Sequence, residues 1–70
     1  MTNSIIKIKV NGKEINISKN LSISSLIKNL NIEAAKVAIE LNGEIIPKSS
    51  YNIKIPKKSN IEIVHFIGGG

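Results

Sequence analysis

Residues 4–17 read SIIKIKVNGKEINI, and this stretch decides how the fold begins. Its aliphatic side chains alternate with polar ones on both sides of an Asn-Gly pair: Ile6, Ile8 and Val10 before the pair, Ile15 and Ile17 after it. An alternation of period two is typical of a strand with one buried face. Asn11-Gly12 is the preferred pair for a two-residue type I′ turn, because both positions need a positive φ. The stretch therefore predicts a β-hairpin.

The hydrophobic period changes after the hairpin. Four aliphatic residues recur at positions i, i+3, i+4 and i+7: Ile23, Leu26, Ile27 and Leu30. This spacing places them on one face of a short helix. Ser22 is a suitable N-cap, because its hydroxyl can accept a hydrogen bond from an N–H group of the first turn. A helix this short needs tertiary packing to be stable, so we expect it to lie against the hairpin.

A second hairpin is predicted by residues 37–46. The sequence VAIEL at 37–41 alternates again, and Asn42-Gly43 repeats the turn pair. Residues 44–46 return as a short strand. Pro47 ends that strand, because proline cannot donate to a ladder.

The remaining residues predict one more strand. Residues 48–60 are mostly polar and contain Pro56, so we expect irregular structure there, with Ile53 and Ile55 as anchors to the core. Residues 61–66 read as the last strand. One short packed helix and a mixed sheet of four or five strands make a two-layer α+β domain. The order of hairpin, helix and later strands suits a β-grasp (ubiquitin-like) fold.

The composition excludes several kinds of protein. The 70 residues suffice for a single domain, 1–70, and they include no cysteine and one histidine. We therefore expect no disulfide and no metal site. No apolar run approaches the roughly 20 residues that a membrane span needs, and the N-terminus lacks the pattern of a signal peptide. These features predict a cytoplasmic protein that does not contact membranes.

The charge is basic, with ten lysines against five glutamates and a net charge of +5. A nucleic-acid surface is one interpretation of this excess. Against it, the lysines are spread from Lys7 to Lys58, and the chain has no arginine and only two aromatic residues. Arginine forks and aromatic platforms are what recognise phosphates and bases well. We therefore expect no nucleic-acid partner, and a small basic nucleic-acid-binding module stays as the alternative from a different class.

The last strand is apolar on both faces. Ile61, Ile63 and Ile67 form one face, and Glu62, Val64 and Phe66 form the other. In a two-layer domain only one face of a sheet is buried. Either a loop or the N-terminal lead covers Val64 and Phe66, or the two side chains form an exposed patch for docking.

The sequence ends in three glycines, Gly68 to Gly70. Glycine loses the most backbone entropy on ordering and adds no packing, so we expect an extended, flexible tail over residues 67–70. Fully extended, that tail reaches roughly 13–14 Å. A tail without Cβ atoms can thread a narrow tunnel and present its terminal carboxylate to another protein's active site. The chain has no cysteine whose side chain could react in place of that carboxylate.

Two segments resemble the ThiS family of thiamine-biosynthesis sulfur carriers. Residues 37–47 read VAIELNGEIIP and are similar to the family's VAVELNGEIVP stretch, and residues 61–70 read IEIVHFIGGG, similar to its VEIVHAIGGG ending. The resemblance covers essentially the whole chain. The lead to Ser4 and the loop at 48–60 depart from the family pattern, and neither touches the tail.

The resemblance implies a carrier that is not itself an enzyme and is a monomer when free. A ThiF-type adenylyltransferase would use ATP to convert the Gly70 carboxylate to an acyl-adenylate, with no cofactor bound to the carrier. A persulfide from a cysteine desulfurase route would then leave a thiocarboxylate on Gly70, and thiazole synthase (ThiG) would receive the sulfur. Gly69, Gly68 and Ile67 would form the stem. The candidate residues for docking to these partners are Phe66, Val64 and His65.

Other interpretations of the same residues stay open. Molybdopterin and tRNA-thiolation carriers share the Gly-Gly end, and a ubiquitin-like modifier would conjugate Gly70 to lysines. His65 is the only imidazole, and without a second catalytic group nearby we expect packing or surface exposure in place of catalysis. We expect Tyr51, the only tyrosine, to be a packing residue on the loop.

Overall fold

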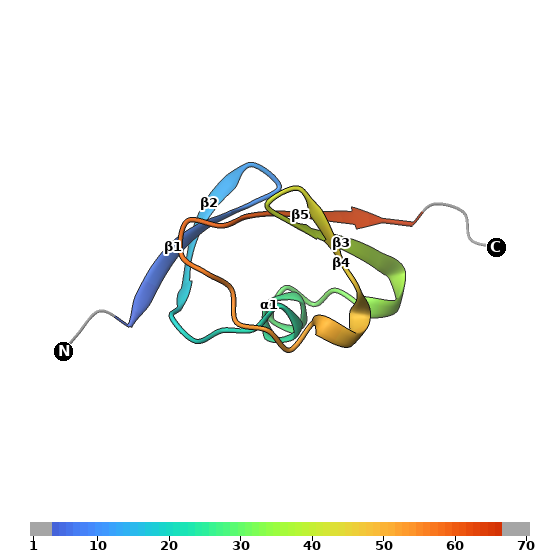
Figure 1. Ribbon diagram of the computed structural model, residues 1–70, viewed down its shortest axis with the longest axis horizontal. Helices are drawn as coiled ribbons and strands as arrows, with labels where there is room; N and C mark the ends of the chain where they lie inside the picture. The colour runs from blue at the N-terminus through green and yellow to red at the C-terminus, as the bar shows by residue number, and fades with distance from the viewer. Residues whose placement is uncertain (1–3, 67–70) are drawn as a thin grey trace.

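The computed structural model describes residues 4–66 as a sheet with one α-helix packed on one of its faces (Figure 1). The elements follow one another as β1 (Ile5–Val10), β2 (Lys13–Ser18), α1 (Ile23–Asn29), the 3-10 helix η1 (Ala34–Lys36), β3 (Val37–Leu41), β4 (Glu44–Ile46), the 3-10 helix η2 (Lys48–Ser50) and β5 (Asn60–His65). Every strand predicted from the alternation is present. None of the helices among residues 4–66 is both long and apolar enough to cross a bilayer.

The two Asn-Gly pairs form the two tight turns that the sequence predicts. Asn11 and Gly12 have φ of 51° and 84°, and Asn42 and Gly43 have φ of 52° and 89°. Both residues of each pair thus have the positive φ that a type I′ turn needs. Each turn joins an antiparallel pair of strands, β1 with β2 and β3 with β4.

The five strands form one mixed sheet in the order β2-β1-β5-β3-β4. The two hairpins lie at the sides, and β5 is inserted between them. It runs parallel to β1, with Lys9 opposite Asn60 and Val10 opposite Ile61, and antiparallel to β3. A mixed five-stranded sheet in this order with a single packed α-helix is the β-grasp arrangement, as expected.

The helix begins as predicted. The Ser22 hydroxyl accepts a hydrogen bond from the Ser25 N–H at 3.1 Å. Ile23, Leu26 and Ile27 are buried against the sheet. Leu30, predicted on the same face, is instead the C-cap residue and is 41% exposed, because the helix ends one residue earlier.

Helix α1 and the inner face of the sheet enclose the core. The buried apolar side chains come from four strands, the helix and the segment before β5: Ile8, Ile17, Ile23, Leu26, Ile27, Val37, Ile39, Tyr51, Ile55, Ile61 and Ile63. Each fully buried aliphatic side chain contributes about 1.5–3 kcal/mol relative to its exposed state. Without a disulfide in the chain, this aliphatic cluster is the main source of stability.

The segment between β4 and β5 is mostly irregular, as predicted, but it is closely attached to the helix. Ile23 and Ser24 donate backbone hydrogen bonds to Ile53 and Tyr51 at 3.1 and 2.7 Å. Ile55 is buried and does anchor the segment, whereas Ile53 is 37% exposed and does not. Tyr51 is buried, as expected of a packing residue, and burial raises the pKa of its hydroxyl.

Candidate functional site

Strand β5 leads to the C-terminal end of the chain from the centre of the sheet (Figure 1). Its inward side chains, Ile61 and Ile63, are buried in the core. On one side it pairs with β3 along its length from Ile61 to His65, and on the other it pairs with the end of β1. A central strand held from both sides gives the last residues of the chain a fixed starting point.

Both turn asparagines bind the backbone of β5. The Asn11 side chain accepts a hydrogen bond from the Ile63 N–H at 2.7 Å, and its amide donates to the Ile63 carbonyl at 3.4 Å. The Asn42 side chain accepts from the Asn60 N–H at 2.8 Å. The β1–β5 ladder covers only two residue pairs, so the Asn11 amide continues it where β1 has already turned away.

The sequence assigned these asparagines only to their turns. A carboxamide both donates and accepts, which a glycine or an aspartate in the same turn cannot do. The presence of asparagine at both turns was the available signal for this second role. The sequence could not reveal that Asn11 binds Ile63, because the two residues are 52 positions apart.

Phe66 is fixed at the end of β5. Its N–H donates to the Lys36 carbonyl at 2.9 Å, which extends the β3–β5 pairing by one residue. The Lys48 ammonium lies 5.6 Å from the centre of the Phe66 ring. A cation at this distance from an aromatic ring contributes about 0.5–1 kcal/mol at an exposed site. The ring therefore lies within reach of the Lys48 side chain.

The apolar side chains near the end of β5 are exposed. Val64 is 49% exposed and Phe66 is 61% exposed, so neither a loop nor any other part of residues 4–66 covers them. Ile45 of β4 is 70% exposed and was missed by the sequence reasoning. Ile45 faces Glu40 and Val64 faces Ala38, so both share the face of the sheet that is turned away from α1.

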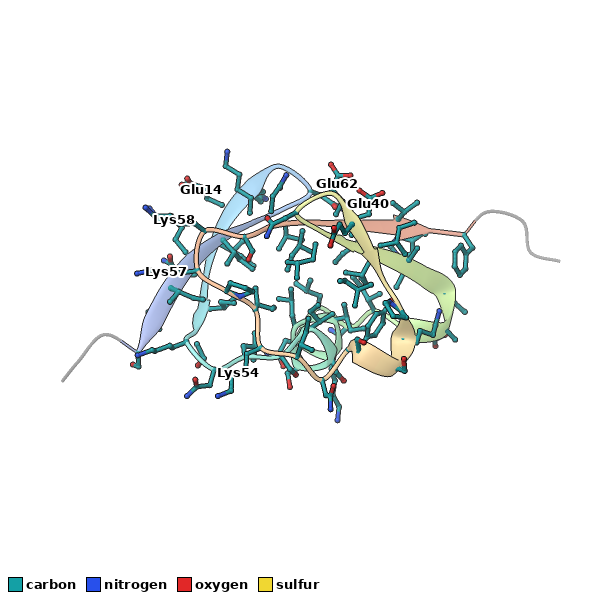
Figure 2. All side chains as sticks on the ribbon, viewed as in Figure 1. Glu14, Glu40, Lys54, Lys57, Lys58 and Glu62 are labelled. Carbon is teal, nitrogen blue, oxygen red and sulfur yellow. The ribbon has the colours of Figure 1, made fainter. Side chains whose placement is uncertain are left out.

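The same outer face carries two carboxylates in direct opposition. Glu40 and Glu62 are paired across β3 and β5, and Figure 2 shows them side by side on the surface away from α1. Like charges opposite each other in a sheet destabilise it by about 0.2–1 kcal/mol. Glu14 and Glu33 have lysine partners, Lys7 at 3.8 Å and Lys36 at 3.2 Å.

In the described part of the chain, neither Glu40 nor Glu62 forms a salt bridge. Lys54, Lys57 and Lys58 lie at the other side of the molecule (Figure 2). We call Val64, Ile45, Glu40 and Glu62, together with Phe66 at the strand end, the β5-end face. It is apolar and acidic although the chain as a whole carries a net charge of +5.

The structure describes only some of the remaining predicted site residues. His65 is exposed and lies opposite Val37 at the end of the sheet. Within residues 4–66, no three His, Cys, Asp or Glu side chains gather so as to hold a metal ion. Ile67, Gly68, Gly69 and Gly70, the predicted stem and reactive residue, lie outside the described residues.

Known proteins resemble this chain in sequence and in structure. The model described as "ThiS family" matches residues 5–70. The sulfur carrier protein ThiS of Bacillus subtilis (strain 168) is 37% identical over 65 residues, which cover 90% of this chain and 98% of that protein. The crystal structure of a thiamine biosynthesis protein (ThiS) from Geobacter metallireducens superposes with a TM-score of 0.80 at 28% identity, covering 93% of this chain and 100% of that one.

A larger protein contains a similar segment. A thiazole synthase of Paramagnetospirillum magneticum (strain ATCC 700264 / AMB-1) is 42% identical over 66 residues, which are 93% of this chain. The chain spans only 20% of that protein's length. The similarity therefore concerns one segment of the longer polypeptide.

Proposed function

This chain belongs to the ThiS family, and we propose that it is a sulfur carrier of thiamine biosynthesis, a protein substrate of partner enzymes and not a catalyst. The observation that carries the proposal is the way β5 presents the end of the chain. The strand is held from both sides up to Ile63, by β3 and by β1 with Asn11, and from the β3 side up to Phe66. The sequence then ends in Gly68-Gly69-Gly70.

The chemistry takes place on the terminal carboxylate of Gly70. Its ordinary pKa of about 3.3–3.7 makes it an anion at neutral pH and a poor electrophile. A ThiF-type adenylyltransferase activates it: a carboxylate oxygen attacks the α-phosphorus of ATP, and pyrophosphate leaves. The outer sulfur of a persulfide, supplied by a cysteine desulfurase, then attacks the carbonyl carbon, and AMP leaves with the oxygen. A second thiol next attacks the inner sulfur of the resulting acyl disulfide, which breaks the S–S bond, forms a new disulfide and leaves the thiocarboxylate on Gly70. ATP is thus a substrate of the partner, and the carrier holds no cofactor of its own.

Thiazole synthase is the proposed acceptor of the sulfur. The similarity to a segment of a thiazole synthase supports this choice, because that polypeptide combines a carrier-like stretch with additional sequence. A single chain that holds both keeps carrier and acceptor at a high effective concentration. A carrier that is not joined to its acceptor has to dock onto it. The cytoplasm, where thiols stay reduced, is the proposed location.

The β5-end face is the proposed docking surface for the adenylyltransferase. Exposed Val64 and Phe66 supply apolar contact area at the end of β5, and His65, between them in sequence, is also exposed. Glu40 and Glu62 add negative charge that a basic partner surface would neutralise. Such a partner relieves the repulsion between the two carboxylates. The complex thereby regains the electrostatic free energy that this repulsion costs the free sheet.

Intact-mass spectrometry tests the proposal. The protein is incubated with ATP, the adenylyltransferase and a persulfide source, and we expect the mass gain of one sulfur-for-oxygen exchange, located by fragmentation on Gly70. The matched control carries one extra residue after Gly70 and is shown by mass to remain uncleaved. If this extended variant still gains sulfur, the terminus is not the carrier and the proposal fails.

A further inference from the structure

The two edges of the sheet differ in how well they are protected. An edge strand presents unpaired N–H and C=O groups, and proteins usually shield them with short strands, proline or bulges. Strand β4 follows this rule, since it has three residues and is ended by Pro47. Strand β2 is less protected: it begins with the charged residues Lys13 and Glu14, but it has six residues, lacks proline and pairs with β1 in unbroken register.

The register identifies the open backbone groups of β2. Val10 and Lys13 flank a two-residue turn and exchange hydrogen bonds, so in an antiparallel ladder the next pair, Lys9 and Glu14, does not. Accordingly, the Lys9 N–H donates to Ser59 at 2.9 Å, and the Lys7 carbonyl accepts from Lys58 at 2.9 Å, on the side of β1 away from β2. The backbone groups of Glu14 and of Asn16, which face Lys9 and Lys7, therefore point outward from the free edge.

A hollow of about 300 Å³ lies directly beside this edge, between β2 and α1. Its lining is mainly aliphatic and comes from both elements and the turn between them: Ile15, Ile17, Leu21, Leu26 and Leu30, with Asn16, Ser18 and Asn29. Leu30 is 41% exposed because α1 ends before it. We call this hollow together with the open edge the β2 groove.

The charges near the β2 groove are mostly positive. Lys13 begins β2, Lys19 follows its last residue, and Lys28 precedes Asn29 of the lining. Glu14 is the only carboxylate on β2, and it pairs with Lys7 at 3.8 Å on the outer face of the sheet. A ligand of the groove therefore gains from negative charge at its ends.

We propose that the β2 groove binds an extended segment of a partner protein, with aliphatic side chains at alternate positions and carboxylates at its ends. The segment adds a sixth strand and bonds to the outward groups of Glu14 and Asn16, while every second side chain enters the hollow. When the segment runs antiparallel to β2, the residues between its aliphatic residues direct their backbone N–H groups toward β2.

This site is separate from the β5-end face, because β1 lies between β2 and β5 in the sheet. A partner held in the β2 groove leaves the tail free to enter an active site. Peptide binding in the β2 groove does not depend on the proposed function, and it can be measured without any sulfur transfer.

The test is a titration of the full-length, ¹⁵N-labelled protein with a capped peptide, followed by NMR. The peptide has valine at every second central position, threonine between the valines and two carboxylates at each end. We expect shifts centred on Glu14, Asn16 and Leu30 and slower amide exchange at Glu14 and Asn16. A control peptide with N-methylated threonine amides keeps the charge and the valines but loses the donors that face β2. Its affinity should fall by about tenfold or more.

Two matched variants test the groove. Leu30→Ser removes an exposed aliphatic side chain from the lining and should weaken peptide binding by about tenfold. Ile45→Ser makes the same kind of change at the other edge, where Ile45 is 70% exposed, and should leave binding unchanged. Because both positions are exposed, the fold should tolerate both changes, which the NMR spectrum of each variant checks directly.

Four outcomes overturn the inference. One is no binding at peptide concentrations of about 1 mM. Another is equal binding of the N-methylated peptide, which would indicate attraction by charge alone. The third is a Leu30→Ser variant with unchanged affinity. The last is a concentration-dependent dimer whose amide shifts centre on β2, which would make a second copy of the chain the occupant.

Discussion

The two faces of the five-stranded sheet differ in what covers them. On the inner face Ile39 and Ile61 are completely buried under α1. On the outer face Ile45 is 70% exposed, and Glu40 faces Glu62 without a salt bridge in the described part of the chain. The side chains of the inner face stabilise the folded domain. The outer face has exposed apolar area and two carboxylates that repel each other, and neither feature stabilises the isolated domain. Such an arrangement is typical of a surface that a partner completes.

The largest expected difference comes from the same substitution on the two faces. Ile61→Ala opens a cavity in the aliphatic core and should lower the free energy of unfolding by about 2–5 kcal/mol. Ile45→Ala removes a side chain that is already in water and should change it by less than about 0.5 kcal/mol. Urea unfolding of both variants measures the contrast. Comparable losses would show that Ile45 belongs to the core.

The second prediction concerns the side chains that hold β5 in place. Asn11→Gly keeps a residue that accepts positive φ but removes both hydrogen bonds to Ile63, so we expect a loss of about 1–2 kcal/mol. Asn42→Gly removes one hydrogen bond, to the exposed Asn60 N–H, and is the matched control. Its cost should be smaller, about 0.5 kcal/mol. Amide exchange at Ile63 should accelerate only in the Asn11 variant. An equal loss in both would mean that the turns, and not the contacts to β5, determine the effect.

The third prediction concerns Phe66→Ala, which should have a small effect on stability. The ring is 61% exposed and its contact with Lys48 is worth at most about 1 kcal/mol, so the melting temperature should change little. Binding to the adenylyltransferase, measured by calorimetry, should weaken by about tenfold or more if the ring enters the partner's surface. Unchanged affinity combined with a large loss of stability would place Phe66 in the core and remove it from the β5-end face.

The local parts of this fold could be predicted from the sequence. Alternation of Ile, Val and polar residues predicted the strands, Asn11-Gly12 and Asn42-Gly43 predicted both turns, and Ser22 predicted the start of α1. Each of these signals involves residues close together in the chain, so the backbone conformation they favour is written in a short window.

The candidate site was only partly predictable. The sequence indicated Val64 and Phe66 as docking candidates but left open whether they are covered, and it gave no sign of Ile45. Exposure depends on what the rest of the chain covers, and no property of a strand by itself contains that information.

The sequence alone determined the strands and the α-helix, the ThiS family resemblance and the glycine ending at Gly70. Only the tertiary structure decided that β5 is inserted in parallel beside β1, that Asn11 binds Ile63 across 52 positions, and that β2 is left as an open edge. The physical reason is the distance along the chain over which each effect acts. Periodicity and turn preference act over a few neighbouring residues, whereas the pairing of distant strands is chosen by the burial of a shared core, to which all of them contribute at once.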